Sequence, residues 1–282
     1  MRIKDFVFAR KVSEAYSHLK ENGESAYLLA GGTSTFFVKS KTQKVAIDIS
    51  RLPIKGISKK RKTFKIGALT TIDEILNYKE SGWVLNKVAL RFVNQQMRNI
   101  STIGGNISRV FYWSDFPVVL LALDGKLKIT DSKTRNVNIS ETFKTMSAHK
   151  DAFKNSILEF IEIPQLVSDM GFGYSKERRT SGAFSSATTA AFVKINKGMI
   201  KDARLALGAV VPFPVRLFDI EKELMGKQAD ISTVEKINYD SLDKIKFVPR
   251  ENMTLDYCRH LIKVKIKDVI CEALNQAIGG GK

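Results

Sequence analysis

The sequence predicts an α+β fold with two domains, residues 1–167 and residues 168–282. Three observations lead to this prediction. The 282 residues suffice for one large or two ordinary domains with a hydrophobic core. Short apolar runs alternate with amphipathic segments as far as Pro164, which is typical of mixed helices and strands. The remainder starts with a long β-hairpin and continues with helices, an order that fits a small antiparallel sheet covered by helices.

The first domain is expected to begin with a compact β-α-β-like unit. A helix is expected over residues 12–22, because Ser13 can cap its start and Gly23 can end it. The elements that follow are a strand at 26–30, a helix through Phe36, Phe37 and Val38, a strand at 45–49, a hairpin at 57–69, a short helix from the capping box at 71–74 through Leu76, and a helix at 84–97.

The later elements include one ambiguous run. Residues 117–123 are all apolar and predict a buried strand or helix, and Asp124-Gly125 is typical of a hairpin turn into a strand at 126–130. The remaining elements are a strand at 156–163, a long hairpin of 184–195 and 199–210, helices over 215–225 and 232–237, and an amphipathic helix at 254–278 with Leu255, Cys258, Leu261, Ile262, Val269, Ile270 and Leu274 on its apolar face.

The composition restricts the classes of partner. Lys and Arg number 46 against 29 Asp and Glu, which gives a formal net charge of +17. This charge suits an anionic surface or an acidic partner subunit. The densest basic run, residues 59–62, falls at a hairpin tip and is interpreted as a solvated turn. With no nucleic-acid motif, no apolar signal segment and no membrane-length apolar run, we expect no nucleic-acid or membrane partner and a cytoplasmic location.

The chain offers few residues for metal or nucleophilic chemistry. Cys258 and Cys271 are too few for an iron–sulfur cluster and are expected to be reduced and buried. The three histidines share no ligand spacing, so we predict no metal site. Because no nucleophile motif and no paired-carboxylate motif occurs, we also predict no catalytic residue supplied by the chain itself.

A glycine-rich turn ends the strand at residues 26–30. The run Leu28-Leu29-Ala30-Gly31-Gly32-Thr33-Ser34 passes from apolar residues to two glycines and two hydroxyl residues. Glycines leave the backbone uncovered, so a phosphate can approach the amide groups closely. Alone, such a turn also fits an ordinary loop.

A second stretch, Ser101-Thr102-Ile103-Gly104-Gly105-Asn106, repeats this chemistry. Two such turns suit a ligand with two phosphates, whose charge the backbone amides of both turns would neutralise. Neither turn is a G-x-G-x-x-G fingerprint, and no P-loop motif occurs in the sequence. A partial match, Gly171-Phe172-Gly173, lacks the third glycine.

Together the two turns resemble those of the FAD-binding subunits of the molybdenum hydroxylases, the family of xanthine dehydrogenase and carbon monoxide dehydrogenase. Further matching pieces occur in the expected order: residues 66–71, residues 96–99, Asp115, residues 205–210 and residues 212–216. The resemblance implies a two-lobed FAD-binding domain of the vanillyl-alcohol-oxidase (PCMH) type, followed by a small α+β C-terminal domain.

The resemblance also implies FAD as the cofactor and a set of contacts to it. Asp115 is expected near the flavin, Ile157 on a strand that closes over it, and Phe172 and Lys176 on the next strand. The full set of candidate FAD contacts is Leu28, Leu29, Ala30, Gly31, Gly32, Thr33, Ser34, Ser101, Thr102, Ile103, Gly104, Gly105, Asn106, Asp115, Ile157, Phe172 and Lys176.

The sequence departs from the family pattern at two places. Relatives usually carry small residues and a proline before the acid at position 115, whereas this chain has Phe111, Tyr112 and Trp113. These rings are expected either to stack on the flavin or to pack against a partner subunit. Relatives commonly carry an acid where Ala183 stands. Both departures concern the electron acceptor more than the flavin.

Three functions are compatible with these observations. The first is the FAD subunit of a molybdenum hydroxylase, which receives electrons from a small [2Fe-2S] subunit beside a molybdopterin-binding large subunit and passes them to NAD⁺ or another acceptor. The second is a stand-alone FAD-dependent reductase of the same broad fold, similar to the enolpyruvyl reductase of cell-wall synthesis (UDP-N-acetylenolpyruvylglucosamine reductase). The third is a basic binding protein on a flavin fold without turnover. The resemblance favours the first.

Overall fold

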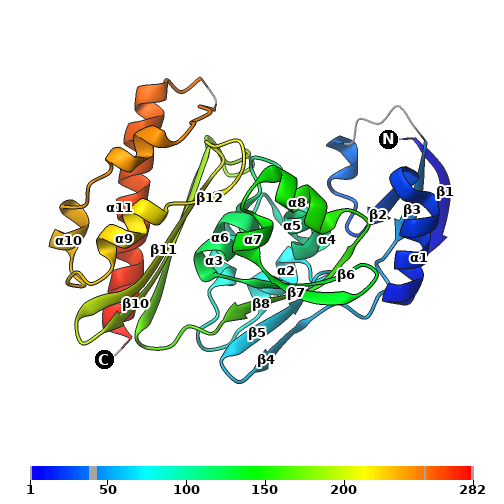
Figure 1. Cartoon of the computed structure of the whole chain (residues 1–282), viewed down its shortest axis with the longest axis horizontal. Helices are drawn as coiled ribbons and strands as arrows, with labels where there is room; N and C mark the ends of the chain where they lie inside the picture. Colours follow the sequence, from blue (N-terminus) through cyan, green and yellow to red (C-terminus); the bar gives the residue numbers. More distant parts are fainter. Residues whose placement is uncertain (1, 38–42, 251, 281–282) are drawn as a thin grey trace.

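A computed structural model describes residues 2–37, 43–250 and 252–280. Its three sheets lie in a row, with the N-terminal sheet at one end and the C-terminal sheet with its long helix at the other (Figure 1). The five-stranded sheet and most of the short helices occupy the middle. No helix of the described residues is both long and apolar enough to cross a bilayer.

The N-terminal sheet is parallel, with β3 (Lys44–Asp48) between β1 (Ile3–Phe8) and β2 (Ala26–Leu29). Helix α1 (Val12–Asn22) connects β1 to β2 and ends at Gly23, whose φ is +50°. The predicted helix and both predicted strands are therefore confirmed. After β2, one 3₁₀ turn, η2 (Thr35–Phe37), occupies the start of the expected helix; Val38, its predicted continuation, lies outside the described residues.

The middle sheet is antiparallel in the order β4-β5-β8-β6-β7. Its strands are β4 (Ile57–Lys60), β5 (Thr63–Gly67), β6 (Lys126–Thr130), β7 (Thr134–Asn138) and β8 (Ile157–Pro164). The basic run ends β4 and forms the turn to β5 with Arg61, at φ +55°, and Lys62, so its predicted place at a hairpin tip is confirmed. Asp124 was expected in a hairpin turn, but it instead adopts the left-handed conformation as the C-cap of a helix.

Short helices cover this sheet: α2 (Ile72–Asn77), α3 (Leu85–Leu90), α4 (Gln95–Ile100), α5 (Ile103–Ser108), α7 (Ile139–Thr142) and α8 (Met146–Phe153). The prediction of a single helix over residues 84–97 is wrong, because α3 ends at Leu90 and a second helix, α4, begins at Gln95. Asn94 caps the second helix by accepting a hydrogen bond from the Met97 amide at 2.8 Å. The local cap offsets the continuous apolar pattern that suggested one helix.

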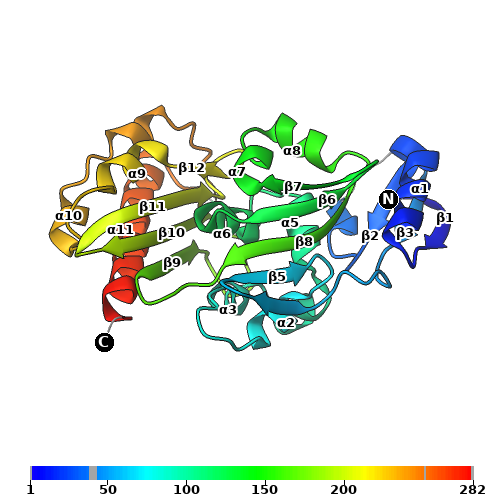
Figure 2. The same ribbon diagram turned by 60° about the horizontal axis from the view of Figure 1, so that its bottom comes forward.

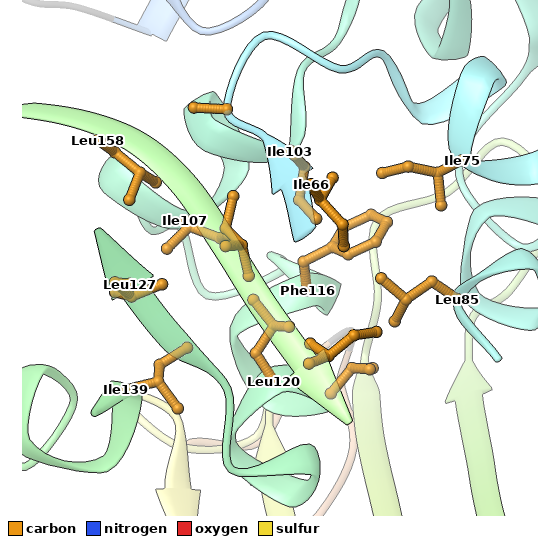
Figure 3. Packing of buried hydrophobic residues seen from close by; sticks show 14 of the residues in the cluster. Ile66, Ile75, Leu85, Ile103, Ile107, Phe116, Leu120, Leu127, Ile139 and Leu158 are labelled. Carbon is orange, nitrogen blue, oxygen red and sulfur yellow. The ribbon is translucent and has the colours of Figure 1, made fainter. Parts of the chain in front are cut away.

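Helix α6 (Asp115–Leu123) is the ambiguous apolar run, and all of its residues are buried. One side packs on α5 and the middle sheet, and the other packs on the C-terminal sheet. A helix that is apolar all round is stable in water only when it is surrounded in this way. Figure 3 shows Phe116 and Leu120 of this helix meeting Ile66, Ile103 and Leu127 from the sheet and from α5.

The C-terminal sheet is antiparallel in the order β12-β11-β10-β9. Its strands are β9 (Met170–Glu177), β10 (Ala187–Asn196), β11 (Met199–Gly208) and β12 (Val215–Arg216). The predicted long hairpin is confirmed, since Lys197 and Gly198, with φ of +50° and +76°, form a two-residue turn.

Helices α9 (Phe218–Leu224), α10 (Ile231–Glu235) and α11 (Leu255–Gly279) complete the chain. In Figure 2, α11 lies along the sheet of β9–β12. The predicted long helix is confirmed, although Leu255 of its expected apolar face is 42% exposed. Both cysteines are free; Cys258 is buried and Cys271 is half-buried.

Glycines on β9 explain the partial nucleotide motif. Phe172, Tyr174 and Lys176 point toward α6, so the alternate residues Gly171 and Gly173 face α11. A Cβ atom would lie 1.8 Å from the Ala273 carbonyl oxygen at position 171 and 2.0 Å from the Val269 carbonyl oxygen at position 173. These glycines therefore permit close packing of strand and helix.

We expect Gly173→Ala to lower the free energy of unfolding by about 2–3 kcal/mol, because the added methyl group forces α11 away from the sheet. Denaturant titration measures this change. Gly182→Ala is the matched control, since nothing lies within 4 Å of the added Cβ and its effect should stay within about 0.5 kcal/mol. Equal effects of the two substitutions would contradict the packing role.

Candidate functional site

A cavity of about 420 Å³ lies where the N-terminal sheet, the middle helices and the C-terminal sheet meet. This volume falls within the range of small-molecule binding sites. Fifteen of the seventeen candidate contacts line it: Leu28, Leu29, Ala30, Gly31, Gly32, Thr33, Ser34, Ser101, Thr102, Gly104, Gly105, Asn106, Asp115, Ile157 and Lys176. The cavity therefore assembles residues from both glycine-rich turns and from both predicted domains.

The two glycine-rich turns touch each other. A Cβ atom on Gly31 would lie 1.8 Å from the carbonyl oxygen of Ile100, so only glycine permits this approach. At the same junction the Ser101 hydroxyl donates a hydrogen bond to the Thr33 hydroxyl at 3.4 Å. The expected proximity of the turns is present, and open space remains beside them.

The first turn offers unused backbone donors. In the described part of the chain, the amides of Gly31, Gly32, Thr33 and Ser34 have no hydrogen-bond partner within the protein. Gly32 has a φ of +70°, a conformation that glycine adopts without strain. Amides exposed to a cavity form a suitable site for phosphate oxygens.

The second turn differs from the expectation, because it is the first turn of helix α5. Thr102 caps this helix by accepting a hydrogen bond from the Gly105 amide at 3.2 Å. The amides of Ile103 and Gly104 donate to the carbonyl groups of Thr70 and Ala68. The second turn therefore supplies shape and hydroxyl groups, while free amides come from the first turn.

Close packing also explains the second pair of glycines. A Cβ atom on Gly104 would lie 2.6 Å from the Ala68 carbonyl oxygen. Ile103 has no exposed surface and points into the core (Figure 3). Ile103 therefore does not line the cavity. Phe172 is likewise fully buried and absent from the cavity wall, because its strand turns it toward α6.

A buried polar network lies at the end of the cavity nearest the C-terminal sheet. The Lys176 ammonium group donates to Asp115 Oδ2 at 2.6 Å, and the two side chains are 3% and 1% exposed. Thr188 donates to Asp115 Oδ1 at 3.4 Å, and Ser185 shares a 2.6 Å hydrogen bond with Thr188. Such a pair needs its hydrogen bonds, because burial of either charge alone is costly.

Tyr174 lies beside this network on the same face of β9. Burial raises the pKa of its hydroxyl well above the ordinary value of 10, and the negative charge of Asp115 raises it further. The hydroxyl therefore stays protonated at neutral pH. Among the described residues it has no hydrogen-bond partner.

Asn106 has a structural partner. Its side-chain oxygen accepts a hydrogen bond from the Phe116 amide at 3.3 Å, which fixes the start of α6 relative to α5. Asn106 thereby helps to place Asp115, the first residue of α6, at the cavity wall.

Sequence reasoning missed several residues that line the cavity. Leu19 of α1, Tyr27 of β2, Phe92 after α3, Phe153 of α8 and Phe184 between β9 and β10 are such residues. Arg109 also lines the cavity, and its guanidinium group donates to the Tyr27 hydroxyl at 3.3 Å. These six residues carry no local motif, since they come from six separate segments that only the fold brings together.

The aromatic residues that depart from the family pattern are at the cavity. Phe111 and Trp113 line it, together with Phe37 and Phe184, whereas Tyr112 does not. Tyr112 instead packs edge-on against Trp113, and the Arg250 guanidinium group lies 4.0 Å from its ring centre. No cluster of three or more potential metal ligands occurs in residues 2–37, 43–250 and 252–280.

Two family models match the chain. The first, described as the FAD binding domain in molybdopterin dehydrogenase, matches residues 2–166. The second, described as the CO dehydrogenase flavoprotein C-terminal domain, matches residues 172–273. The chain belongs to the FAD-binding subunits of the molybdenum hydroxylases. This flavoprotein subunit is thus part of an oxidoreductase, and its cofactor is FAD.

Curated relatives cover nearly the whole chain. The medium chain of glyceraldehyde dehydrogenase from Sulfolobus acidocaldarius is 28% identical over 92% of this chain and 94% of its own. The xanthine dehydrogenase FAD-binding subunit of Escherichia coli O157:H7 is 26% identical over 97% of this chain and 96% of its own.

A solved structure shows the same fold. Carbon monoxide dehydrogenase from Hydrogenophaga pseudoflava contains a chain with a TM-score of 0.87 and 24% identity, covering 98% of both chains. The expected architecture, a two-lobed FAD-binding domain followed by a small α+β domain, is confirmed.

The residues present fit FAD. Unpartnered amides in the cavity lining match the two phosphates, and the lining also includes aromatic and aliphatic side chains that suit planar rings. Residues Gly31–Ser34 would hold the pyrophosphate, and the chain needs no lysine for that purpose.

We expect Gly31→Ala to weaken FAD binding at least tenfold, because the added methyl group must displace the Ile100 carbonyl group and separate the turns. Isothermal titration of the apoprotein with FAD measures the affinity. Gly125→Ala is the control, since its Cβ would meet nothing nearer than 3.4 Å. Unchanged affinity in Gly31→Ala would contradict the role of the contact.

We expect Lys176→Met to lower the free energy of unfolding by about 3–5 kcal/mol, because Asp115 then keeps a buried, unpaired charge. The double substitution Asp115→Asn with Lys176→Met should recover part of this loss, and denaturant titration of all variants forms a double-mutant cycle. Strict additivity of the two single effects would show that the pair does not interact.

Proposed function

We propose that this subunit relays electrons within a molybdenum hydroxylase complex. In this proposal a small [2Fe-2S] subunit delivers electrons that a molybdopterin-binding large subunit has taken from its substrate. This chain passes them to NAD⁺ or another acceptor. The supporting observation is the cavity itself, which brings residues of both turns and the Asp115–Lys176 pair into one site.

The orientation of FAD follows from the chemistry of the two cavity ends. In this proposal the free amides of the first turn bind the pyrophosphate, and one ring of FAD lies on each side of it. The end with Leu19, Tyr27 and Phe153 suits the adenine ring, whose demands are mainly apolar. The other end provides the Lys176 ammonium group, a hydrogen-bond donor that suits the polar edge of the isoalloxazine ring.

The chain's own residues then bind and orient, while the bound flavin supplies the redox chemistry. Lys176 places a positive charge where reduction adds negative charge, and its pairing with Asp115 fixes that ammonium group. The apolar walls exclude water. The net charge of +17 favours docking of more acidic subunits, and a cytoplasmic location stays a prediction from the sequence.

Affinity purification of the full chain at native expression tests this proposal. We expect a yellow complex that contains FAD, molybdenum and iron, with two further polypeptides, one large and one small. A full-chain variant with Gly31→Ala serves as a control, because partner docking should survive loss of flavin. Recovery of the yellow chain alone, with no molybdenum or iron, would contradict the proposed electron relay and favour a stand-alone reductase.

A further inference from the structure

Four aromatic rings at the cavity form a continuous group, which we term the aromatic cluster: Phe37, Phe111, Trp113 and Phe184. Trp113 is sandwiched between two of them. Its ring centre lies 4.7 Å from Phe111 with planes 5° apart, and 4.2 Å from Phe184 with planes 22° apart. Offset stacking of this kind stabilises a fixed arrangement of rings.

Phe37 closes the cluster from the side. Its ring centre lies 5.4 Å from both Phe111 and Trp113 and 6.2 Å from Phe184. The four rings come from three segments, namely the turn after β2, the loop between α5 and α6, and the loop between β9 and β10. The cluster therefore joins both glycine-turn regions to the C-terminal sheet across the cavity.

The position of Phe184 shows which part of the cavity the cluster covers. Phe184 lines the cavity although it is 41% exposed, which places it at the cavity mouth. The next residue, Ser185, is buried and bonds to Thr188, which bonds to Asp115. The cluster thus covers the same end as the Asp115–Lys176 pair, which is the flavin-ring end in our proposed orientation.

Trp113 is the residue that holds Phe184 in place. Phe184 belongs to the connection between β9 and β10, which is tied down by the Arg178 guanidinium group donating to the Arg91 carbonyl group at 2.9 Å. At the other end of this connection, the Phe184 ring stacks on Trp113 and lies edge-on to Phe37. Loss of the Trp113 stack should raise the open population of this loop roughly two- to tenfold.

Hydride transfer between a flavin and a nicotinamide requires the two rings face to face, with the reacting atoms about 3–3.5 Å apart. In our proposed orientation, the stacked rings of the aromatic cluster would occupy that space. A one-electron acceptor needs no such stacking, because an electron can leave through the exposed edge of the ring. Arg109, whose guanidinium carbon lies 5.7 Å from the Phe111 ring centre, and Arg250 on Tyr112 give the rim a positive charge.

We propose that the aromatic cluster is a lid held by Trp113, which excludes nicotinamide from the flavin and restricts the acceptor to one-electron carriers. This inference rests on the proposed function and specifies its acceptor. On oxidation, FADH₂ releases two electrons and two protons. Two acceptor molecules take one electron each, and both protons go to water. Trp113 acts through Phe184 and is a positioning residue.

Two rates on the FAD-loaded full chain test the lid by stopped flow. One is reduction of the oxidised flavin by NADH, and the other is reoxidation of the dithionite-reduced flavin by ferricyanide. We expect slow reduction of the wild type by NADH, and a ratio of the NADH rate to the ferricyanide rate that is at least tenfold higher in Trp113→Ala. Trp113→Phe should behave as the wild type, because a ring still stacks on Phe184.

A readout independent of turnover is quenching of flavin fluorescence by acrylamide. Its quenching constant should rise at least twofold in Trp113→Ala and stay unchanged in Tyr112→Ala, the matched control whose ring adjoins Trp113 but does not line the cavity. Phe184→Ala should reproduce Trp113→Ala, and serves in its place if that variant does not accumulate.

Rapid reduction of the wild type by NADH, or equal quenching constants in all variants, would overturn the lid. Loss of FAD from both Trp113→Ala and Phe184→Ala would also overturn it, because the lid acts on access and not on cofactor binding. These outcomes differ from failure of the proposed function, in which the chain binds no FAD or no molybdenum and iron–sulfur subunits.

Discussion

The approach of two backbone segments, at Gly31 and at Ile100, is the constraint on which the site depends. The gap between them is smaller than a methyl group, so the first turn and the end of α4 touch as bare main chain. This contact fixes the N-terminal sheet against the helices of the middle region. The amides of the first turn belong to residues that line the cavity, and they have no partner in the described chain. In our proposal these amides bind the diphosphate of FAD, and such a site requires no cationic side chain.

A second constraint joins this arrangement to the C-terminal sheet. Helix α6 is buried between two sheets, and its first residue, Asp115, faces a lysine from β9. The strand alternates its side chains, so Lys176 reaches the cavity while Gly171 and Gly173 accept the long helix on the opposite face. One strand thus supplies a charge to the site and a groove for α11. The division at residues 167/168 remains our proposal for the domain boundary.

Most of the fold could be predicted from local patterns. Helix α1, the hairpin at Lys197-Gly198 and the long C-terminal helix α11 depend on turn chemistry and periodicity, which act over a few residues. The errors have tertiary causes. Glycine disfavours helix, yet Thr102 and the contact with Ala68 place Gly104 and Gly105 in the first turn of α5. The same division holds for the site. Residues in the glycine-rich motifs could be predicted from the sequence, whereas Tyr27, Phe92 and Phe184 are brought to the cavity only by the fold.

The ion pair between Asp115 and Lys176 has a consequence for how such subunits can diverge. Each partner belongs to a different half of the molecule, and each is buried almost completely. Recombination that exchanged one half for that of a distant relative would strand a charge unless the incoming half carried the matching group. The two halves are therefore expected to be inherited as a single unit, however freely their outer surfaces change.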